Sequence, residues 1–281
     1  REQILPEQIH ILNVSFLVPT LRREFGGCAG NIAYSLHQLG GTPLVMAALG
    51  TDGQDYLQRL QDWGVSTEFV RTIDGQYTAQ AIIMTDLDNN QITAFHPGAM
   101  GEAHQTRITA REDIRLAIIA PDGREAMIGH AQQLAAAGIP FIFDPGQGLP
   151  MFNGEELRRF VSQATWVALN DYEARMLCER TGQDLASLSR SHLQGVVVTL
   201  GEQGCEVWTQ GERQHIPGVK AAAVVDPTGC GDAFRAALLY GLERGWPLAR
   251  CAELGNRLGA LKIACSGPQN HRIDRATLAL D

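Results

Sequence analysis

The stretch Val224-Val225-Asp226-Pro227-Thr228-Gly229-Cys230-Gly231-Asp232-Ala233-Phe234 joins an apolar run, a glycine-punctuated turn and the start of a helical pattern. We expect a strand that ends at Asp226 and a helix over about 231–244. The N–H groups of such a turn converge with the positive end of the helix dipole, a geometry that binds an anion. Asp232 falls in the first helical turn, where a carboxylate can accept a proton from an attacking hydroxyl. A tight turn and an acid that suits the dipole would give the same residues without any function.

Upstream of this stretch, short apolar runs alternate with segments of helical period from about residue 40 onward. Strands are expected at 44–49, 116–120, 139–143, 166–169 and 196–200. Helices are expected at 52–63, 124–137, 155–164, 171–181 and 247–265, with glycines at 138 and 182 closing two of them and Pro247 in a first turn. This alternation predicts a mostly parallel sheet covered by helices on both faces.

Two stretches interrupt the alternation because they have the strand pattern without a helix between them. They are Ile9 to Val18 and the pair Thr78 to Thr85 and Gln91 to His96. Asp88-Asn89-Asn90 supplies the turn residues of a hairpin. We expect these stretches to form a small separate sheet that projects from the main layer.

Composition limits the classes of function. The chain has 281 residues and a formal net charge of −8, so it lacks the positive charge that holds a nucleic-acid backbone or an anionic membrane. Lys220 and Lys262 are the only lysines, and no P-loop motif occurs. The six cysteines show no zinc or disulfide spacing and are interpreted as reduced thiols of a cytoplasmic protein. No apolar run is long enough to span a membrane.

The segment from Asp226 to Asp232 resembles the C-terminal signature D-[TS]-x-G-A-G-D of the PfkB (ribokinase-like) carbohydrate and nucleoside kinases. The chain departs from it at Pro227 and Cys230. Neither departure removes an N–H group from the stretch between Gly229 and Asp232. The resemblance implies that Asp232 is the catalytic base and that the amides of Gly229, Cys230 and Gly231 form an anion hole.

A second match lies near the other end of the chain. Gly26-Gly27-Cys28-Ala29-Gly30-Asn31 is similar to the N-terminal signature G-G-x-x-x-N of the same family. Glycines let a substrate approach the backbone, and an asparagine amide both donates to and accepts from hydroxyl groups. The resemblance implies substrate binding by Gly26, Gly27 and Asn31. The alternative is a glycine loop with Asn31 as an ordinary helix N-cap.

A third match follows the strand expected at 166–169. Asn170-Asp171-Tyr172-Glu173 resembles the N-x-x-E motif, which implies that Asn170 and Glu173 help to place Mg²⁺, here through water. An N-cap residue followed three positions later by glutamate is also a capping box. The two roles are compatible.

Two smaller matches concern the nucleotide. Thr199-Leu200-Gly201-Glu202-Gln203-Gly204 resembles the T-x-G-x-x-G segment near ATP, which implies contacts from Thr199, Gly201 and Gly204. Asn256 and Gly259 fall on the last long helix, where the family builds its adenine pocket. A generic hairpin and a generic packed helix are the alternatives.

The resemblance covers about residues 9 to 270 and implies a three-layer α/β/α ribokinase-like fold with a mostly parallel central sheet and a small β-sheet lid. We expect one kinase domain over 1–281, with lid segments at about 5–20 and 76–97. The family also opens with a strand and an aspartate that holds substrate hydroxyls, so we expect a strand upstream of Arg1. A need for a monovalent cation such as K⁺ and a homodimer formed through the lid remain open.

The expected activity is transfer of the γ-phosphate of ATP, with Mg²⁺, to a primary hydroxyl of a nucleoside, with adenosine favoured. The residues 226–232 and Ser266-Gly267-Pro268-Gln269-Asn270-His271 together resemble bacterial adenosine kinase-like members, and Phe16 and Leu17 on a lid strand would cover a purine. A sugar kinase of the ribokinase or fructokinase type is the rival. A non-catalytic ligand-binding protein on this scaffold is a second alternative. A dehydrogenase lacks its G-x-G-x-x-G motif here, and a hydrolase lacks G-x-S-x-G.

Overall fold

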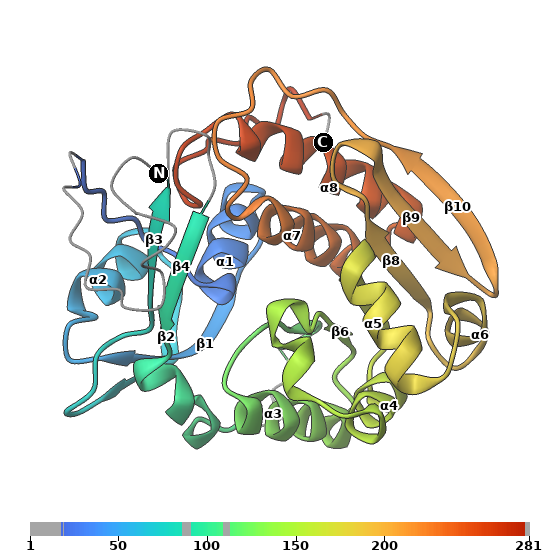
Figure 1. Cartoon of the computed structure of the whole chain (residues 1–281), viewed down its shortest axis with the longest axis horizontal. Coiled ribbons are helices and arrows are strands. Elements are labelled where there is room, and N and C mark those ends of the chain that lie inside the picture. The colour runs from blue at the N-terminus through green and yellow to red at the C-terminus, as the bar shows by residue number, and fades with distance from the viewer. Residues whose placement is uncertain (1–17, 19, 86–90, 109–112, 279–281) are drawn as a thin grey trace, which may run out of the picture.

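The computed structural model describes residues 18, 20–85, 91–108 and 113–278 of the chain. Its largest sheet has six strands in the order β10-β9-β8-β7-β6-β5 (Figure 1). The strands are β5 (Ala117–Ile119), β6 (Phe141–Phe143), β7 (Trp166–Asn170), β8 (Gly195–Thr199), β9 (Gly204–Thr209) and β10 (Glu212–Pro217). Strands β5 to β8 run parallel, and β9 and β10 continue the sheet with antiparallel pairing. The prediction of a mostly parallel sheet is confirmed.

Helices cover both faces of this sheet. One face carries α3 (Arg124–Ala137), α4 (Gly154–Gln163), α5 (Asp171–Thr181) and α6 (Leu185–Arg190), and the other carries α1 (Cys28–Gln38), α7 (Cys230–Glu243) and α8 (Leu248–Ile263) (Figure 1). Alternate strand residues divide between the two cores. Ile142, Ala168 and Val197 join the core beneath α7 and α8, whereas Phe143 and Val167 pack against α3 to α6. The period-two pattern of each strand thus builds the three-layer α/β/α fold.

Two further sheets lie apart from the six-stranded one. Strands β1 (Leu44–Gly50) and β2 (Ser66–Ile73) are parallel and are connected by α2 (Gln54–Asp62). Strands β3 (Gln80–Thr85) and β4 (Gln91–His96) form an antiparallel hairpin. Among the described residues this hairpin is a separate two-stranded sheet, as predicted for the strand pair 78–85 and 91–96. Residues 9–17 of the other expected lid strand, and the turn at 88–90, lie outside the described residues.

Local sequence signals correctly predicted the first and last residues of several elements. Helices α3 and α5 have the predicted bounds, and Gly138 and Gly182 adopt the left-handed conformation at their ends with φ of 67° and 71°. The expected strand before Asp226 is wrong. Residues 218–226 form no strand, and Val224 is 80% exposed. The N–H groups of Val225 and Asp226 donate instead to the carbonyl of Ile263 at the end of α8.

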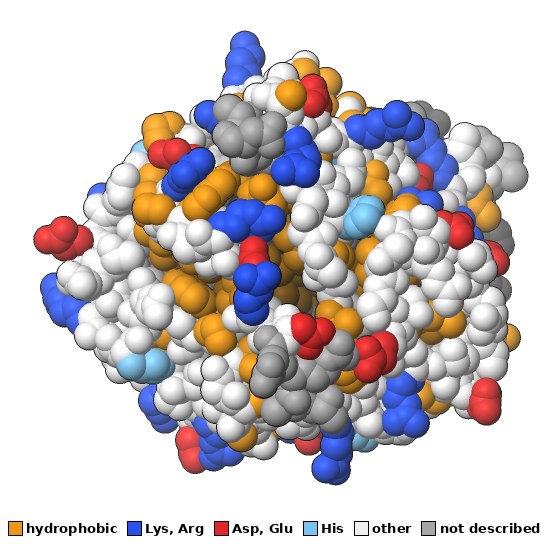
Figure 2. Space-filling model, turned by 180° about the vertical axis from the view of Figure 1, so that it is seen from behind, with side chains coloured by type: hydrophobic (Ala, Val, Ile, Leu, Met, Phe, Trp, Pro, Cys, Tyr) orange, Lys and Arg blue, Asp and Glu red, His pale blue; other side chains and the backbone are white. Residues whose placement is uncertain are grey.

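Three short helical turns complete the described chain: η2 (Gly98–Gln105), η3 (Gly146–Met151) and η4 (Gly201–Gln203). Pro247, which was expected in the first turn of α8, is instead its N-cap. No helix among the described residues combines the length and the apolar character that a membrane span requires. On the face opposite to that of Figure 1, acidic and basic side chains are interspersed around a hollow with hydrophobic lining (Figure 2).

Helices α7 and α8 pack closely because glycine lies at their contact. A Cβ atom on Gly255 would lie 2.6 Å from Cδ2 of Phe234, well inside van der Waals contact. Phe234 belongs to the core beneath these helices. The position therefore requires glycine for its small size.

We predict that Gly255→Ala lowers the free energy of unfolding by about 1–3 kcal/mol because the new methyl group overpacks the contact with Phe234. Gly129→Ala in α3 is the matched control, since the nearest atom to its Cβ would be 3.8 Å away. This control should gain about 0.5–1 kcal/mol from helix propensity. Urea unfolding of both variants checks the pair, and equal effects would contradict the packing argument.

Candidate active site

The turn that leads into α7 is held by the Asp226 carboxylate. One of its oxygens accepts the N–H of Thr228 at 2.9 Å, and the other accepts the N–H of Gly267 at 2.8 Å. Gly229 follows as the N-cap of α7 with a φ of 84°, a conformation that glycine adopts without strain. Asp226 thus joins the turn before α7 to the loop after α8.

Amide groups at the start of α7 form the candidate anion hole. The N–H of Cys230 donates to the carbonyl of Pro227 at 3.2 Å, so this amide is partly engaged within the turn. The N–H groups of Gly231 and Asp232 belong to the first helical turn, where no earlier helical carbonyl can accept them. The helix dipole adds positive potential at the same place. An anionic phosphoryl group is the kind of ligand that this turn can bind.

The structure brings together the two predicted signatures. Asn31 lies in the first turns of α1 and donates from Nδ2 to Oδ2 of Asp232 at 2.8 Å, across 201 positions of sequence. The N-cap of α1 is Gly27, with a φ of 86°, so the alternative that Asn31 is an ordinary N-cap is wrong. Residues 31 and 232 share one site, as the proposed chemistry requires.

A chain of hydrogen bonds fixes the orientation of the Asn31 amide. Nε2 of Gln269 donates to Oδ1 of Asn31 at 2.9 Å and contacts the hydroxyl of Tyr56 at 2.6 Å. The Tyr56 hydroxyl donates to the carbonyl of Gly26 at 2.6 Å. Because Oδ1 of Asn31 already accepts a hydrogen bond, its NH₂ group must point toward Asp232.

Buried charges surround the Asp232 carboxylate. Arg235 lies one helical turn later and forms an ion pair with Asp144 at 2.9 Å, and both side chains are less than 8% exposed. Burial raises the pKa of Asp232 to about 6, and Asp144 adds to this increase, whereas the hydrogen bond from Asn31 and the charge of Arg235 oppose it. A carboxylate with this pKa is ionised at neutral pH and is a stronger base than an ordinary aspartate.

Cys28 also contacts this group. Burial raises the pKa of its thiol well above the usual value, and the neighbouring Asp232 and Asp144 charges raise it further. The Cys28 side chain hydrogen-bonds to Asp232. It therefore acts as a neutral thiol that donates to the carboxylate.

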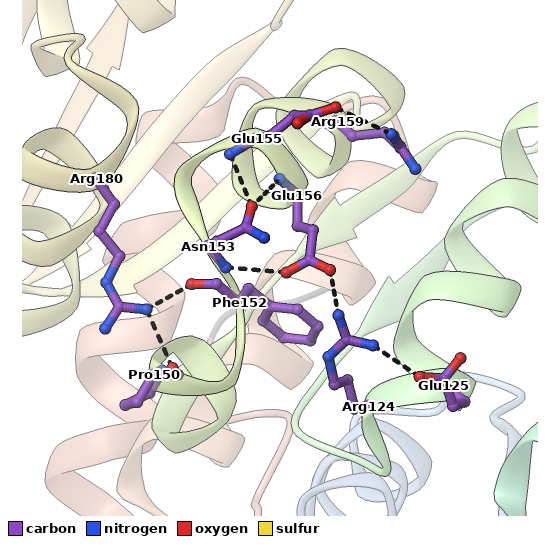
Figure 3. Close-up of polar contacts among 9 residues, drawn as sticks. All are labelled: Arg124, Glu125, Pro150, Phe152, Asn153, Glu155, Glu156, Arg159 and Arg180. Atoms are coloured by element: carbon purple, nitrogen blue, oxygen red, sulfur yellow. Dashed lines mark hydrogen bonds and ion pairs between the residues drawn. The ribbon is translucent and has the colours of Figure 1, made fainter.

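Figure 3 shows how the segment after Asp144 is anchored. Arg180 donates to the carbonyls of Pro150 and Phe152 on this segment, the first at 3.1 Å and the second at 2.5 Å. Asn153 caps α4 through a reciprocal box with Glu156, which also pairs with Arg124. These contacts join α3, α4 and α5 around the segment, while the N–H of Asp144 itself donates to the carbonyl of Ile119 on β5 at 2.9 Å.

Asn170 and Glu173 form the capping box that their spacing predicts. Oδ1 of Asn170 accepts the N–H of Glu173 at 2.8 Å, and both carboxylate oxygens of Glu173 accept from Asn170. Burial raises the pKa of Glu173, although the Asn170 N–H and the Arg235 charge oppose the increase. The described residues contain no group of three or more side chains suited to a metal ion.

The residues predicted to bind the nucleotide lie near the place where β8, β9 and β10 meet. Thr199 pairs with Cys205, directly beside Gly204, and Gly204 pairs with Pro217. Nδ2 of Asn256 donates to the carbonyl of Pro217 at 3.0 Å. Gly201 begins the turn between β8 and β9 with a φ of 60°, and Gly259 lies one helical turn after Asn256, with open space where a Cβ would be.

Four residues of the site were not singled out from the sequence: Tyr56, Asp144, Arg235 and Gln269. Asp144 carried a usable signal, because it directly follows a strand of a parallel sheet. Arg235 lies three positions after Asp232 and so on the same helix face. Gln269 lies in the stretch 266–271 that resembles adenosine kinase-like members, and Tyr56 lies on an expected helix. Neither was given a role, because only the tertiary fold brings Gln269 to Asn31 and Tyr56 to Gln269.

Comparison with known proteins identifies the family. Residues 2–275 match the model of the pfkB family of carbohydrate kinases. The chain belongs to this family. It is therefore a phosphotransferase that acts on an alcohol group, and its fold is the ribokinase-like fold.

Individual relatives of this PfkB chain are nucleoside kinases. The structure of Burkholderia thailandensis nucleoside kinase in complex with inosine is 53% identical, has a TM-score of 0.90, and matches over 94% of this chain and 89% of that chain. The same enzyme in complex with ADP-inosine has a TM-score of 0.87 over 98% of this chain and 86% of that chain. Nucleoside kinase of Methanocaldococcus jannaschii is 28% identical over 92% of this chain and 85% of its own length.

The pKa of Asp232 predicts the pH dependence of this kinase. We expect kcat/KM to rise with pH as Asp232 loses its proton, with an inflection near pH 6, and to level above it. Initial rates at saturating ATP across this range measure the profile. An inflection near pH 4, where an unperturbed aspartate titrates, would contradict the effect of burial.

Proposed function

We propose that the chain is an ATP-dependent nucleoside kinase that phosphorylates a primary hydroxyl, with Asp232 as the general base. The observation that carries this proposal is the 2.8 Å hydrogen bond between Asn31 and Asp232. It joins the signature expected to bind the acceptor to the signature expected to bind the phosphoryl group. The high identity to a nucleoside kinase bound to inosine supports a nucleoside acceptor.

The substrate hydroxyl would donate its proton to the Asp232 carboxylate. Asn31 and Cys28 already donate to this carboxylate, and the lone pairs of its oxygens that they leave are available to the alcohol. The raised pKa makes proton transfer more favourable while the group stays ionised at neutral pH. Asn31 also has the donor and acceptor capacity to orient a ribose hydroxyl next to it.

The amides of Gly229 and Gly231, with the partly engaged amide of Cys230, would stabilise negative charge on the transferring phosphoryl oxygens. Mg²⁺, when bound with ATP, neutralises phosphate charge. Glu173 and Asn170 fit an indirect role toward it, because the Glu173 carboxylate is committed to the capping box yet retains free lone pairs. The phosphates and water would supply most ligands of this ion.

The nucleotide would extend from this anion hole along the ends of β8 and β9. Thr199, Gly201 and Gly204 border the path of the phosphates, and Asn256 and Gly259 would border the adenine. The lack of a Cβ at Gly259 leaves room for a flat ring beside α8. The hairpin β3–β4, within the lid segment 76–97, would close over the acceptor and exclude water.

Adenosine remains the favoured acceptor within the nucleoside class, and inosine is the one that the structural relative holds. We predict ATP-dependent phosphorylation of adenosine, inosine and guanosine with kcat/KM at least about tenfold above that for ribose and fructose. A coupled ADP-release assay across these five compounds measures the ratio. Preference for ribose or fructose would establish the rival sugar kinase.

We predict that Asp232→Asn lowers kcat by about 10²–10⁴-fold and leaves nucleotide binding nearly unchanged, because only the base is removed.

The same variant should be more stable than the parent above pH 6. The folded-state pKa of about 6 exceeds the usual 3.8, so stability from this group falls as pH rises from about 4 to 6. Turnover, ADP titration calorimetry and urea unfolding at pH 5 and 8 test these points. Full turnover by the variant would favour a different base.

A homodimer through the lid is part of the same proposal. Both faces of the β3–β4 hairpin carry exposed apolar side chains: Ile82, Met84 and Ile92 on one face and Ile83 and Phe95 on the other. Substrate can cover only one face of a two-stranded sheet, and a second copy would cover the other.

We also propose a cytoplasmic location, which the six free cysteines support.

Sedimentation velocity tests the dimer. The parent chain is expected to sediment as a dimer, and Phe95→Lys is expected to sediment as a monomer because it places a charge in the apolar contact. Val219→Lys, at an exposed apolar position outside the hairpin, is the control and should remain dimeric. A monomeric parent chain would exclude the dimer.

A further inference from the structure

Lys262 is a buried cation that the proposed mechanism does not use. It lies near the end of α8, and its side chain is 0% exposed. Its ammonium donates to the carbonyl of Asp226 at 2.8 Å and to the carbonyl of Cys265 at 3.0 Å. Within the described part of the chain, no carboxylate lies within ion-pair distance of it, although its charge helps to lower the pKa of Asp226. Burial of a lysine is rare because an ammonium loses its hydration, so the position calls for a specific reason.

The two carbonyls belong to the loops that build the anion hole. Asp226 begins the turn into α7, and Cys265 begins the loop that continues to Gln269. The loops also touch at Gly229, where a Cβ would lie 2.8 Å from Cβ of Pro268. Through these two carbonyls, Lys262 links the turn that would bind phosphate to the loop that contains Gln269, which orients Asn31.

The charge of Lys262 reaches the anion hole itself. Burial raises the pKa of the Cys230 thiol, and the Lys262 charge opposes that increase, whereas the charges of Asp226 and Asp232 add to it. Cys230 is one of the residues that would face the phosphoryl group. The ammonium thus contributes positive potential on the protein side of the site where negative charge develops.

Backbone carbonyl oxygens inside a protein are the ligands that K⁺ takes in place of water. A lysine ammonium carries the same single charge and satisfies the same oxygens, and it is attached to the chain. The residues present at this place do not fit an additional monovalent cation, because the ammonium already occupies the carbonyls.

We propose that Lys262 acts as a built-in monovalent cation behind the anion hole, so that phosphoryl transfer by this chain requires no K⁺. The proposal rests on the proposed kinase function. Lys262 is a positioning residue, since it acts through the two loops and through its field rather than by touching the substrate.

The experiment measures kinase activity and ADP affinity of the purified chain in K⁺, NH₄⁺ and tetramethylammonium buffers at equal ionic strength. The parent chain should show the same values in all three. Lys262→Met removes the charge and keeps the apolar stem. It should lose about 10–100-fold in kcat/KM in tetramethylammonium and recover part of the loss in K⁺ or NH₄⁺. Lys220→Met, at the exposed second lysine, is the matched control and should behave as the parent.

Activation of the parent chain by K⁺ would overturn the proposal. So would a folded Lys262→Met chain that has parental activity and no cation response. If this variant fails to fold, the parent chain decides alone, because a response to K⁺ contradicts a built-in cation and its absence supports one. ADP affinity separates this outcome from failure of the kinase proposal, since it reports cation dependence even when no acceptor is phosphorylated.

Discussion

The hydrogen bond between Asn31 and Asp232 is the contact on which the organisation of the site depends. It joins α1 to α7 across 201 positions of sequence. Helix α1 carries the glycine-rich segment at its start, and α7 carries the candidate anion hole at its own start, so the contact brings the starts of the two helices to one place. Gln269 and Tyr56 then fix which end of the Asn31 amide meets the carboxylate. This chain of donors helps to fix the orientation of the Asp232 carboxylate, the proposed base.

Function at this site has a cost in stability. Asp144, Arg235 and Asp232 place three charges in a region that excludes water, and burial is the main reason that the pKa of Asp232 is raised. Arg235 offsets part of the cost because it pairs with Asp144 while its charge also acts on Asp232. The contacts of Arg180 and the capping box of Asn153 stabilise the segment that follows Asp144 (Figure 3). Contacts outside the candidate site thus stabilise the segment next to these buried charges.

Much of the fold followed from local signals in the sequence. Helices with glycine ends were predicted to the residue because a left-handed C-cap is a local requirement, met at Gly138 and Gly182. The prediction of a strand before Asp226 failed because the apolar pair Val224-Val225 was interpreted as a strand, whereas the N–H groups of Val225 and Asp226 donate to the last residue of α8. The motifs singled out Asn31 and Asp232, whereas the contacts of Gln269 with Asn31 and of Lys262 with Asp226 form only in the tertiary fold. One sequence by itself does not show which residues far apart in the chain will come into contact after folding.

The most direct test is a measurement of the Asp232 carboxyl pKa by ¹³C NMR in the parent chain and in Asn31→Ala. A signal assigned by comparison with Asp232→Asn should titrate near pH 6 in the parent. It should titrate at higher pH in Asn31→Ala, because the hydrogen bond from Asn31 favours the ionised form. An ordinary aspartate value that is the same in both proteins would contradict the account, since Asp232 would then be neither buried nor held by Asn31.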